Sequence, residues 1–346
     1  LGIDFTLKQF EREFKKKSLN LSPADYFDRH IENQMKEGRF GNADVFRCTL
    51  RILKLFDKKF EKMKFPDIDE RYIKRFDAFL RTERNLKETS ISVYMRTLAA
   101  LLNAAIKDGL IQPGAYPFQT KTNPGYKISD LNTETRKRFI PTKYLTALEN
   151  YQFDDLRLET ARNLFLFSFY CRGMNWIDMA MLSPANLHKE ISESGEPITV
   201  IKYNRAKTHK EYEITVNDDI QKLLDWFRVM PHSKKYLLPI VTVPENEGEA
   251  LRLHIKERLH KHNKALVEIA KIEELKFPDA LHSITSYFSR HSYAMALRKN
   301  GNSIELISES LGHSDLKTTS IYLDSFGREA VAKASENLLR HENSNS

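Results

Sequence analysis

The sequence predicts a mainly α-helical protein with two domains, the second of which carries a small β-hairpin or sheet. Three observations lead to this fold class. The length, 346 residues, suits two domains of ordinary size. Apolar residues recur at helical spacing along most of the chain. Residues 198–203 and 211–216 form two short β-branched or alternating runs across a tight turn, a pattern typical of a hairpin.

Residues 5–112 carry helical periodicity with no competing strand pattern. One helix face of this region is marked by the apolar residues Tyr94, Leu98, Leu101 and Ala105. The periodicity stops at the Asp-Gly pair 108–109, and the stretch 112–127 that follows contains three prolines and two glycines. These residues interrupt regular structure, so we predict that a linker follows the helical N-terminal domain.

Helical patterns resume beyond the linker, at 142–151, 156–170, 217–230, 249–272, 285–299 and 303–311. Near the C-terminus, Val331, Ala334 and Leu338 form one apolar stripe, which must be buried on its own domain or on a neighbouring protomer. The predicted parts are a helical domain at 1–112, a linker at 113–139, an α-rich domain at 140–327, and a C-terminal helix with a polar tail at 328–346.

The charge is unevenly distributed along the chain. The whole sequence has 55 Lys and Arg against 47 Asp and Glu, a net charge of +8. Residues 1–140 hold 28 basic and 19 acidic residues, whereas 141–346 hold 27 and 28. A basic region indicates a polyanionic partner such as nucleic acid, because neutralised phosphates release condensed counterions. A solvated basic surface with no such partner is the alternative.

The composition also indicates the cellular compartment in which the protein is expected. No apolar run approaches the ~20 residues that a membrane-spanning helix needs. Two cysteines, Cys48 and Cys171, cannot form a disulfide framework or a four-cysteine zinc site. We therefore expect a cytoplasmic protein with no membrane partner. The chain opens at Leu1 without a signal-peptide pattern, which is consistent with a fragment lacking an upstream segment.

Several catalytic motifs are missing from the sequence. It has no Gly-rich phosphate loop with Lys-Ser/Thr, no G-x-G-x-x-G and no G-x-S-x-G. Its histidines show no zinc-ligand spacing, and His260 and His262, which lie two apart among lysines, are expected on an exposed helix face. We therefore expect no metal, nucleotide or other cofactor.

Two cations stand at unusual places in the second domain. Arg172 directly follows the apolar run 164–170, where an unpaired buried charge would be costly. It is either paired, with Asp178 as the candidate partner, or directed at a functional anion. Lys207 lies in the turn between the two predicted strands, from which its ammonium could enter a groove, although such turns are usually only polar.

Three blocks near the C-terminus provide the strongest local signal. They are Tyr287-Phe288-Ser289-Arg290-His291-Ser292, Leu311-Gly312-His313-Ser314 and Thr318-Thr319-Ser320-Ile321-Tyr322. With Arg172 and Lys207 upstream, this order resembles the tyrosine recombinase (phage integrase) family, whose nucleophilic Tyr follows the His of its Leu-Gly-His block by nine residues. His313 and Tyr322 have that spacing. The resemblance covers about residues 20–330. In detail, the sequence is similar to integrases of Bacteroidetes-type mobile elements.

The resemblance implies a core-binding domain, a catalytic domain and a division of chemical labour. Tyr322 is the implied nucleophile, forming a 3′-phosphotyrosyl intermediate without metal or ATP. Arg172 and Arg290 are implied to clamp the scissile phosphate with planar guanidiniums. Lys207 would protonate the leaving 5′ hydroxyl, and His313 would hydrogen-bond the phosphate or the attacking phenol.

Two departures from the family pattern affect the site assignments. Tyr287 stands where the family has the His of its H-x-x-R-H block, and a phenol does not titrate near neutrality. Tyr287 and the adjacent His291 are therefore secondary candidates. The family's first Arg position aligns with Asn175, three residues beyond Arg172. We favour Arg172 for the role, since a bent loop and a long side chain can cover that distance.

The predicted partner is double-stranded DNA, with phosphate contacts from Lys87 and Arg96 of the N-terminal domain. The resemblance further implies a tetramer on DNA and allows an accessory DNA-bending protein. The predicted function is site-specific recombination or integration of a mobile element. A non-catalytic DNA-binding protein of the same fold and a type IB topoisomerase-like relaxing enzyme are the alternatives.

Overall fold

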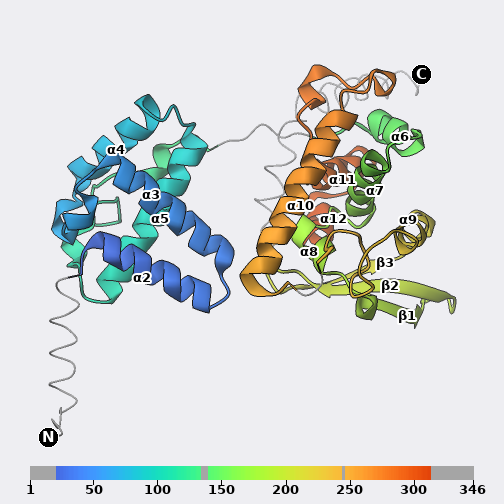
Figure 1. Cartoon of the computed structure of the whole chain (residues 1–346), viewed down its shortest axis with the longest axis horizontal. Helices are drawn as coiled ribbons and strands as arrows, with labels where there is room; N and C mark the ends of the chain where they lie inside the picture. The colour runs from blue at the N-terminus through green and yellow to red at the C-terminus, as the bar shows by residue number, and fades with distance from the viewer. Residues whose placement is uncertain (1–20, 134–138, 244–245, 313–346) are drawn as a thin grey trace, which may run out of the picture. The chain divides into compact units, whose positions relative to one another are not determined.

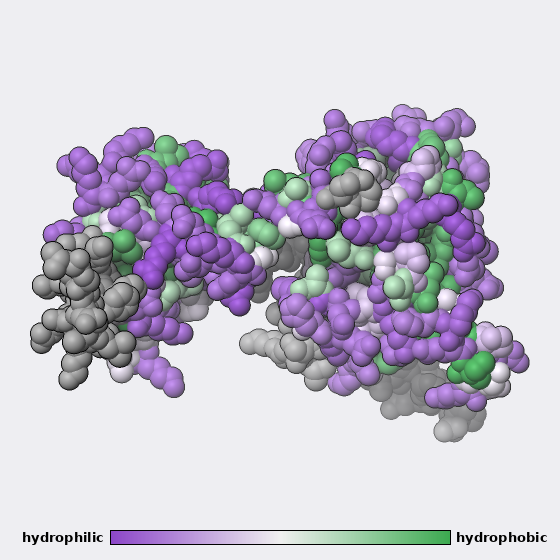
Figure 2. Space-filling view, turned by 60° about the horizontal axis from the view of Figure 1, so that its bottom comes forward, coloured by the Kyte–Doolittle hydropathy of each residue, from purple (hydrophilic) through white to green (hydrophobic). Residues whose placement is uncertain are grey.

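The computed structural model describes residues 21–133, 139–243 and 246–312. These residues fold into two compact units that divide between Thr135 and Arg136, coloured blue to green and green to orange in Figure 1. Helices dominate both units, which confirms the predicted fold class. Within the described residues, no helix combines the length and the apolar character needed to cross a membrane. Hydrophilic residues cover most of the face seen in Figure 2, with small hydrophobic groups between them.

The first unit consists of four α-helices and four short 3₁₀ helices. They are α2 (Pro23–Lys36), α3 (Phe40–Phe56), η1 (Phe60–Lys62), η2 (Phe65–Asp67), α4 (Glu70–Thr82), α5 (Glu88–Lys107), η3 (Pro113–Ala115) and η4 (Ile128–Asp130). Local sequence explains two of the helix starts. The Ser22 Oγ accepts from the Asp25 N–H at 3.1 Å, and the Asp69 Oδ1 accepts from the Tyr72 N–H at 2.7 Å. Each cap satisfies a backbone donor that the first helical turn leaves open.

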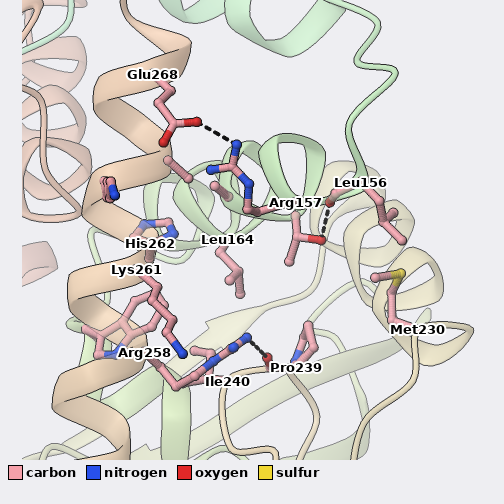
Figure 3. Close-up of a pocket in the computed structure, with 15 residues that line it drawn as sticks. Leu156, Arg157, Leu164, Met230, Pro239, Ile240, Arg258, Lys261, His262 and Glu268 are labelled. Atoms are coloured by element: carbon pink, nitrogen blue, oxygen red, sulfur yellow. Dashed lines mark hydrogen bonds and ion pairs between the residues drawn. The ribbon is translucent and has the colours of Figure 1, made fainter.

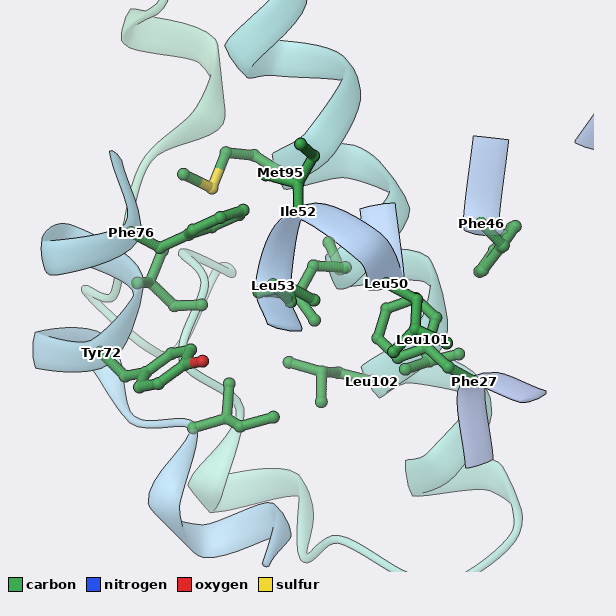
Figure 4. Close-up of a cluster of buried hydrophobic side chains, with 14 of the residues drawn as sticks. Phe27, Phe46, Leu50, Ile52, Leu53, Tyr72, Phe76, Met95, Leu101 and Leu102 are labelled. Atoms are coloured by element: carbon green, nitrogen blue, oxygen red, sulfur yellow. The ribbon is translucent and has the colours of Figure 1, made fainter. Parts of the chain in front are cut away.

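The core of the first unit is rich in aromatic rings, and Figure 4 shows side chains of α2, α3, α4 and α5 meeting in it. The Phe56 ring lies 5.2–5.3 Å from the rings of Tyr72, Phe76 and Phe79, in tilted and edge-on contacts that stabilise aromatic pairs. These contacts pack α3 against α4 within the core of the first unit.

Much of the predicted linker 113–139 is packed on the first unit and does not run free between the two units. Tyr116, Phe118 and Leu131 are buried in the core of the first unit. The Asn103 Nδ2 donates to the Tyr116 hydroxyl at 3.0 Å, which ties this stretch to α5. The prolines and glycines do end regular structure, as predicted, but the aromatic residues between them bring the chain back onto the bundle.

The second unit contains seven α-helices, a three-stranded sheet and three 3₁₀ helices among its described residues. The helices are α6 (Thr142–Asn150), α7 (Leu156–Tyr170), α8 (Trp176–Met181), η5 (Pro184–Asn186), α9 (Asp218–Arg228), α10 (Gly248–Ile269), η6 (Glu273–Leu275), η7 (Asp279–Leu281), α11 (Tyr287–Lys299) and α12 (Ile304–Leu311). Residues 161–168 of α7 are buried without interruption. A helix that is buried all round lies at the centre of a domain. Its sides serve two hydrophobic clusters, one containing Leu164 and Phe167 and the other Ala161 and Phe165.

The sheet has the order β1–β2–β3 and is antiparallel, with strands β1 (Leu187–Ile191), β2 (Pro197–Asn204) and β3 (Glu211–Thr215). The predicted hairpin corresponds to β2 and β3. Ile201 pairs with Ile214, and both side chains are buried in the core below the sheet. The sequence pattern did not predict β1, because most of its side chains are exposed and show no alternating apolar pattern.

Candidate active site

The loop that follows α7 has two consecutive residues in the left-handed region, Arg172 with φ 56° and Gly173 with φ 68°. The N–H groups of Gly173 and Met174 both donate to the Ser168 carbonyl, at 2.8 and 3.2 Å, which turns the chain back at the helix end. An arginine with positive φ is uncommon. The half-buried Arg172 side chain makes no hydrogen bond or ion pair with any described residue, Asp178 included. The structural-pair alternative is therefore not supported, and Arg172 is available to an anion.

Arg290 lies in the second turn of α11 and is only 5% exposed. Its Nη1 donates to the Gly173 carbonyl at 3.1 Å, and its Nη2 donates to the Leu311 carbonyl at the end of α12. The Tyr212 hydroxyl of β3 donates to the same Leu311 oxygen at 2.9 Å. A Cβ on Gly173 would lie 2.5 Å from the Arg290 Cα, so this position requires glycine. Arg290 thus joins the loop after α7 to the end of α12, and the shared Leu311 carbonyl ties this point to β3.

The β2–β3 turn carries Lys207, which is exposed. The turn is held by Asp178 of α8, whose Oδ1 accepts from the Ala206 N–H at 2.8 Å. Asp178 is 5% exposed, and this burial raises the pKa of its carboxyl, while the Ala206 N–H and the nearby Arg205 act in the opposite direction. Lys207 is therefore presented by a turn that is fastened to α8, next to the loop that carries Arg172.

Asn175 makes a contact that the sequence analysis did not foresee. With its amide oxygen turned toward the guanidinium of Arg205, Asn175 accepts from the Arg205 Nε at 3.2 Å and from its Nη2 at 2.9 Å. A hydrogen bond between Asn175 and Asp178 lowers the pKa of that carboxyl. The residue at the family's first Arg position therefore binds an arginine from the hairpin turn. The only sign of this contact in the sequence was a basic turn, Asn204 to Lys210, from which Lys207 alone was taken as a candidate.

Tyr287 and His291 are one helical turn apart on α11. Their rings meet edge-on, with centroids 4.7 Å apart. Tyr287 is 49% exposed and His291 is half-buried. The Tyr287 phenol is therefore accessible at the start of α11, the helix that also carries Arg290. The His291 ring packs beside it.

In the first unit, Lys87 and Arg96 are both exposed, Lys87 as the residue that caps α5 and Arg96 in its middle. Neither forms an ion pair with a described acidic residue. Their charges are therefore open to an external anion, unlike those of Arg81 and Lys74, which pair with carboxylates at 2.7–2.9 Å.

Two of the predicted catalytic residues, His313 and Tyr322, lie outside the described residues, as does the apolar stripe of the C-terminal tail. The described chain reaches Gly312, which ends α12 in the left-handed conformation with φ 63°. A Cβ at Gly312 would overlap the Tyr212 hydroxyl, so the Leu-Gly-His block begins at a tightly packed point.

The second unit also has a cavity of about 630 Å³ between α7, α8 and α10 (Figure 3). Its floor is apolar, and its rim carries Arg157, Arg258 and Lys261. His262 lines it, 6% exposed and stacked on Trp176 at 4.5 Å, so the prediction of an exposed face was wrong for this residue. The apolar stacking partner could not be read from the flanking lysines. None of the predicted catalytic residues lines this cavity.

The described residues contain no cluster of three or more His, Cys, Asp or Glu that could hold a metal ion. Cys48 and Cys171 are both free thiols, and burial raises the pKa of the Cys171 thiol. The contacts described above bring the guanidiniums of Arg205 and Arg290 near the buried Asp178 carboxylate and beside the loop that carries Arg172. Such an arrangement suits the binding of an anion, in particular a phosphate.

Sequence comparisons identify two family segments in the chain. Residues 24–128 match the phage integrase SAM-like domain, and residues 188–328 match the phage integrase family. The chain is also similar to a tyrosine recombinase of Thermosipho africanus (strain TCF52B), with 24% identity over 297 residues that cover 85% of this chain and 89% of the relative.

Structural comparisons agree on the fold. The chain is similar to the XerH site-specific recombinase bound to palindromic difH, with a TM-score of 0.60, 17% identity and coverage of 88% of this chain and 83% of that one. It is also similar to the Tn1549 transposon integrase in complex with transposon right end DNA, with a TM-score of 0.58, 14% identity and coverage of 91% and 100%. The cationic site, the two family segments and the recombinase relative lead to one conclusion: the chain belongs to the tyrosine recombinase (phage integrase) family and is a site-specific DNA recombinase.

Proposed function

We propose that the second unit cuts one DNA strand through attack of the Tyr322 phenolate on the scissile phosphorus. The new bond makes a 3′-phosphotyrosine, and the bond to the 5′ oxygen breaks. Lys207 gives its proton to that oxygen, so a 5′ hydroxyl leaves. The reverse attack by a 5′ hydroxyl rejoins a strand and releases Tyr322. Because the phosphotyrosine conserves the bond energy, the cycle needs neither ATP nor a metal.

In this proposal Arg172 and Arg290 bind the non-bridging oxygens of the scissile phosphate. The observation that carries the proposal is the position of Arg290, whose guanidinium joins the carbonyl next to Arg172 to the end of α12. The loop cation and the Leu-Gly-His block are thereby held on opposite sides of one guanidinium. His313, next to Gly312 in the sequence, would then hydrogen-bond the phosphate or the attacking phenol.

The position of Lys207 on the hairpin supports its role as the proton donor. The Asp178 contact fixes the backbone one residue before Lys207, while the Lys207 side chain itself is exposed and free to reach a duplex. From this fastened turn the Lys207 ammonium would give its proton to the leaving oxygen.

For substrate binding we propose that the first unit contacts duplex phosphates through Lys87 and Arg96, which are exposed and without a described acidic partner. Such contacts set the affinity and register more than the choice of sequence. We further propose a tetramer on DNA, as in the lambda integrase tetramer bound to a Holliday junction, a structure to which this chain is similar with a TM-score of 0.51 and 12% identity. An accessory DNA-bending protein and a cytoplasmic location belong to the same proposal.

The covalent intermediate provides the test. The protein is incubated with DNA of its host element, covalent adducts are trapped under denaturing conditions, and the attached DNA is sequenced to locate the cleavage site. A nicked suicide duplex built on that site should then accumulate adduct with the wild-type chain and none with Tyr322→Phe, which removes only the attacking oxygen.

Two results would reject the assignment. Adduct formation by the Tyr322→Phe variant would show that another residue is the nucleophile. Relaxation of supercoiled DNA without exchange between two duplexes would indicate a topoisomerase-like cycle instead of recombination.

A further inference from the structure

We propose that Arg205, on the β2–β3 turn, provides a further phosphate-binding guanidinium. It reaches the active site from the hairpin and is held there by Asn175. This inference rests on the proposed function above, because it concerns the same phosphate. It assigns a role to a residue for which neither the sequence pattern nor the comparisons predict one.

Arg205 makes few hydrogen bonds for a half-buried arginine. The side chain is half-buried, and it is held by the neutral Asn175 amide, whose oxygen accepts from Nε and Nη2. A guanidinium has five N–H donors. This geometry therefore leaves most donors of Arg205 without a described partner, and the nearby Asp178 carboxylate interacts with it without forming an ion pair. A half-buried cation held by a neutral amide is suited to receive an anion.

Asn175 lies two residues after Gly173, whose carbonyl accepts from the Arg290 Nη1 at 3.1 Å. Asn175 also begins α8, on which the buried Asp178 carboxylate interacts with both Arg205 and Arg290, and each of these cations lowers its pKa. One short stretch of chain therefore brings the two guanidiniums toward the same carboxylate. No described contact links Arg172 with that carboxylate in the same way.

The Arg205 N–H donates to the Lys210 carbonyl at 2.9 Å, and the Arg205 carbonyl accepts from the His209 N–H at 2.8 Å, which closes the turn on both sides of Lys207. With the contact between Asp178 and the Ala206 N–H, the backbone at Arg205 is fixed at three points. One rigid turn would thus present both Arg205 and the proton donor Lys207 to the phosphate.

The hypothesis is tested with the full chain on two suicide duplexes that differ only at the scissile position. One carries the natural phosphodiester, and the other carries a methylphosphonate, in which a methyl group replaces one charged oxygen. Arg205→Ala should lower adduct formation on the phosphodiester by about 10²-fold, the usual effect of losing one preorganised donor. On the uncharged methylphosphonate the loss should shrink to a few-fold, because less negative charge needs neutralising.

Matched variants separate catalysis from folding and from positioning. Arg228→Ala removes the same charge from an exposed part of α9 and should cleave both substrates like the wild type. Arg205→Lys retains a cation without the planar fork, so its rate of adduct formation should lie between those of the wild type and Arg205→Ala. It is the variant to use if Arg205→Ala folds poorly. Asn175→Ala should reduce the rate less than Arg205→Ala does.

Two outcomes would overturn the proposal. One is wild-type cleavage of the phosphodiester by Arg205→Ala. The other is an equal loss on both substrates, which would mean that Arg205 only shapes the turn. Either outcome leaves the nucleophile assignment intact, since that assignment depends on Tyr322→Phe alone.

Discussion

The two units differ in the kind of polar group that they bury. Among the described residues of the first unit, the buried polar side chains are all neutral: Gln34, Thr49, Ser92 and Thr97. The second unit buries the ionisable groups Arg162, Asp178, His262 and Arg290. Burying a charge costs free energy unless the fold binds it or uses it. Among the described residues, the first unit therefore leaves its charged side chains at least partly exposed, where they suit a polyanionic partner, whereas the second unit fixes some of its ionisable groups inside.

The largest effect that would test this contrast is expected at Arg290. Arg290→Lys keeps a cation, but its single nitrogen cannot reach the Gly173 and Leu311 carbonyls and a phosphate as the planar fork does, so adduct formation at saturating protein should fall by about 10²-fold or more. DNA affinity should change little, since the first unit would supply most phosphate contacts. Arg228→Lys is the matched exposed control. A wild-type cleavage rate for Arg290→Lys would mean that the buried guanidinium is only structural.

A second prediction concerns the packing behind Arg290. Gly173→Ala would place a Cβ 2.5 Å from the Arg290 Cα at a residue with φ 68°. We expect the free energy of unfolding to fall by about 2–4 kcal/mol, from overpacking and backbone strain together. Urea unfolding followed by tryptophan fluorescence measures this, because Trp176 and Trp226 are the two tryptophans of the chain and both lie in the second unit.

Gly195→Ala is the control for that measurement. Gly195 also has a positive φ, 85°, but nothing lies within 4 Å of its added Cβ. Backbone strain alone should cost about 1 kcal/mol there. Equal losses for the two alanine variants would show that contact with Arg290 contributes nothing.

The third prediction concerns the buried His262. Burial lowers the pKa of His262 to about 3 from the ordinary 6.5, so the folded state favours the neutral ring. The resulting stability is fully present above pH 6.5 and is lost as the pH falls toward 3, because the unfolded chain then binds a proton that the folded chain does not. This one group should lower the free energy of unfolding by up to about 1.4 kcal/mol per pH unit in that window.

His262→Phe keeps an aromatic ring beside Trp176 but cannot titrate. The variant should therefore lose stability less steeply than the wild type between pH 7 and pH 5, as measured by urea unfolding. His260→Gln, at the exposed neighbour, should keep the wild-type slope. Parallel pH profiles for His262→Phe and the wild type would contradict the prediction.

The smallest effect is expected on the surface of the first unit. Lys87→Ala should weaken DNA binding a few-fold and reduce the dependence of log K on log salt by about 1, because one phosphate contact is lost. Lys74→Ala is the matched control, since the Lys74 ammonium already pairs with Glu70 at 2.7 Å. Fluorescence anisotropy at several salt concentrations checks both. An unchanged salt slope for Lys87→Ala would place the DNA on another face.

Much of the fold was predictable from local pattern. The helical pattern at 156–170 corresponds to α7 residue for residue, and the hairpin runs correspond to β2 and β3 within one or two residues. An apolar stretch in α7, the alternating residues of the hairpin, capping residues such as Asp155 and Asn217, and a glycine after α12 determine these elements locally. The edge strand β1 was not predictable in this way, since backbone pairing with β2 holds it in place.

The sequence by itself determined the family, the order of the catalytic candidates and the helical character of both units, because spacing and periodicity are properties of the chain. The sequence also indicated that Arg172 follows an apolar helix, where an unpaired buried charge would be costly. Only the tertiary structure decided which groups meet. Asn175 and Arg205 are 30 positions apart in the numbering, and Gly173 and Arg290 are much further apart, yet hydrogen bonds join both pairs. Such contacts depend on how the hairpin and α11 pack against α7 and α8, and no local pattern in the sequence records that packing.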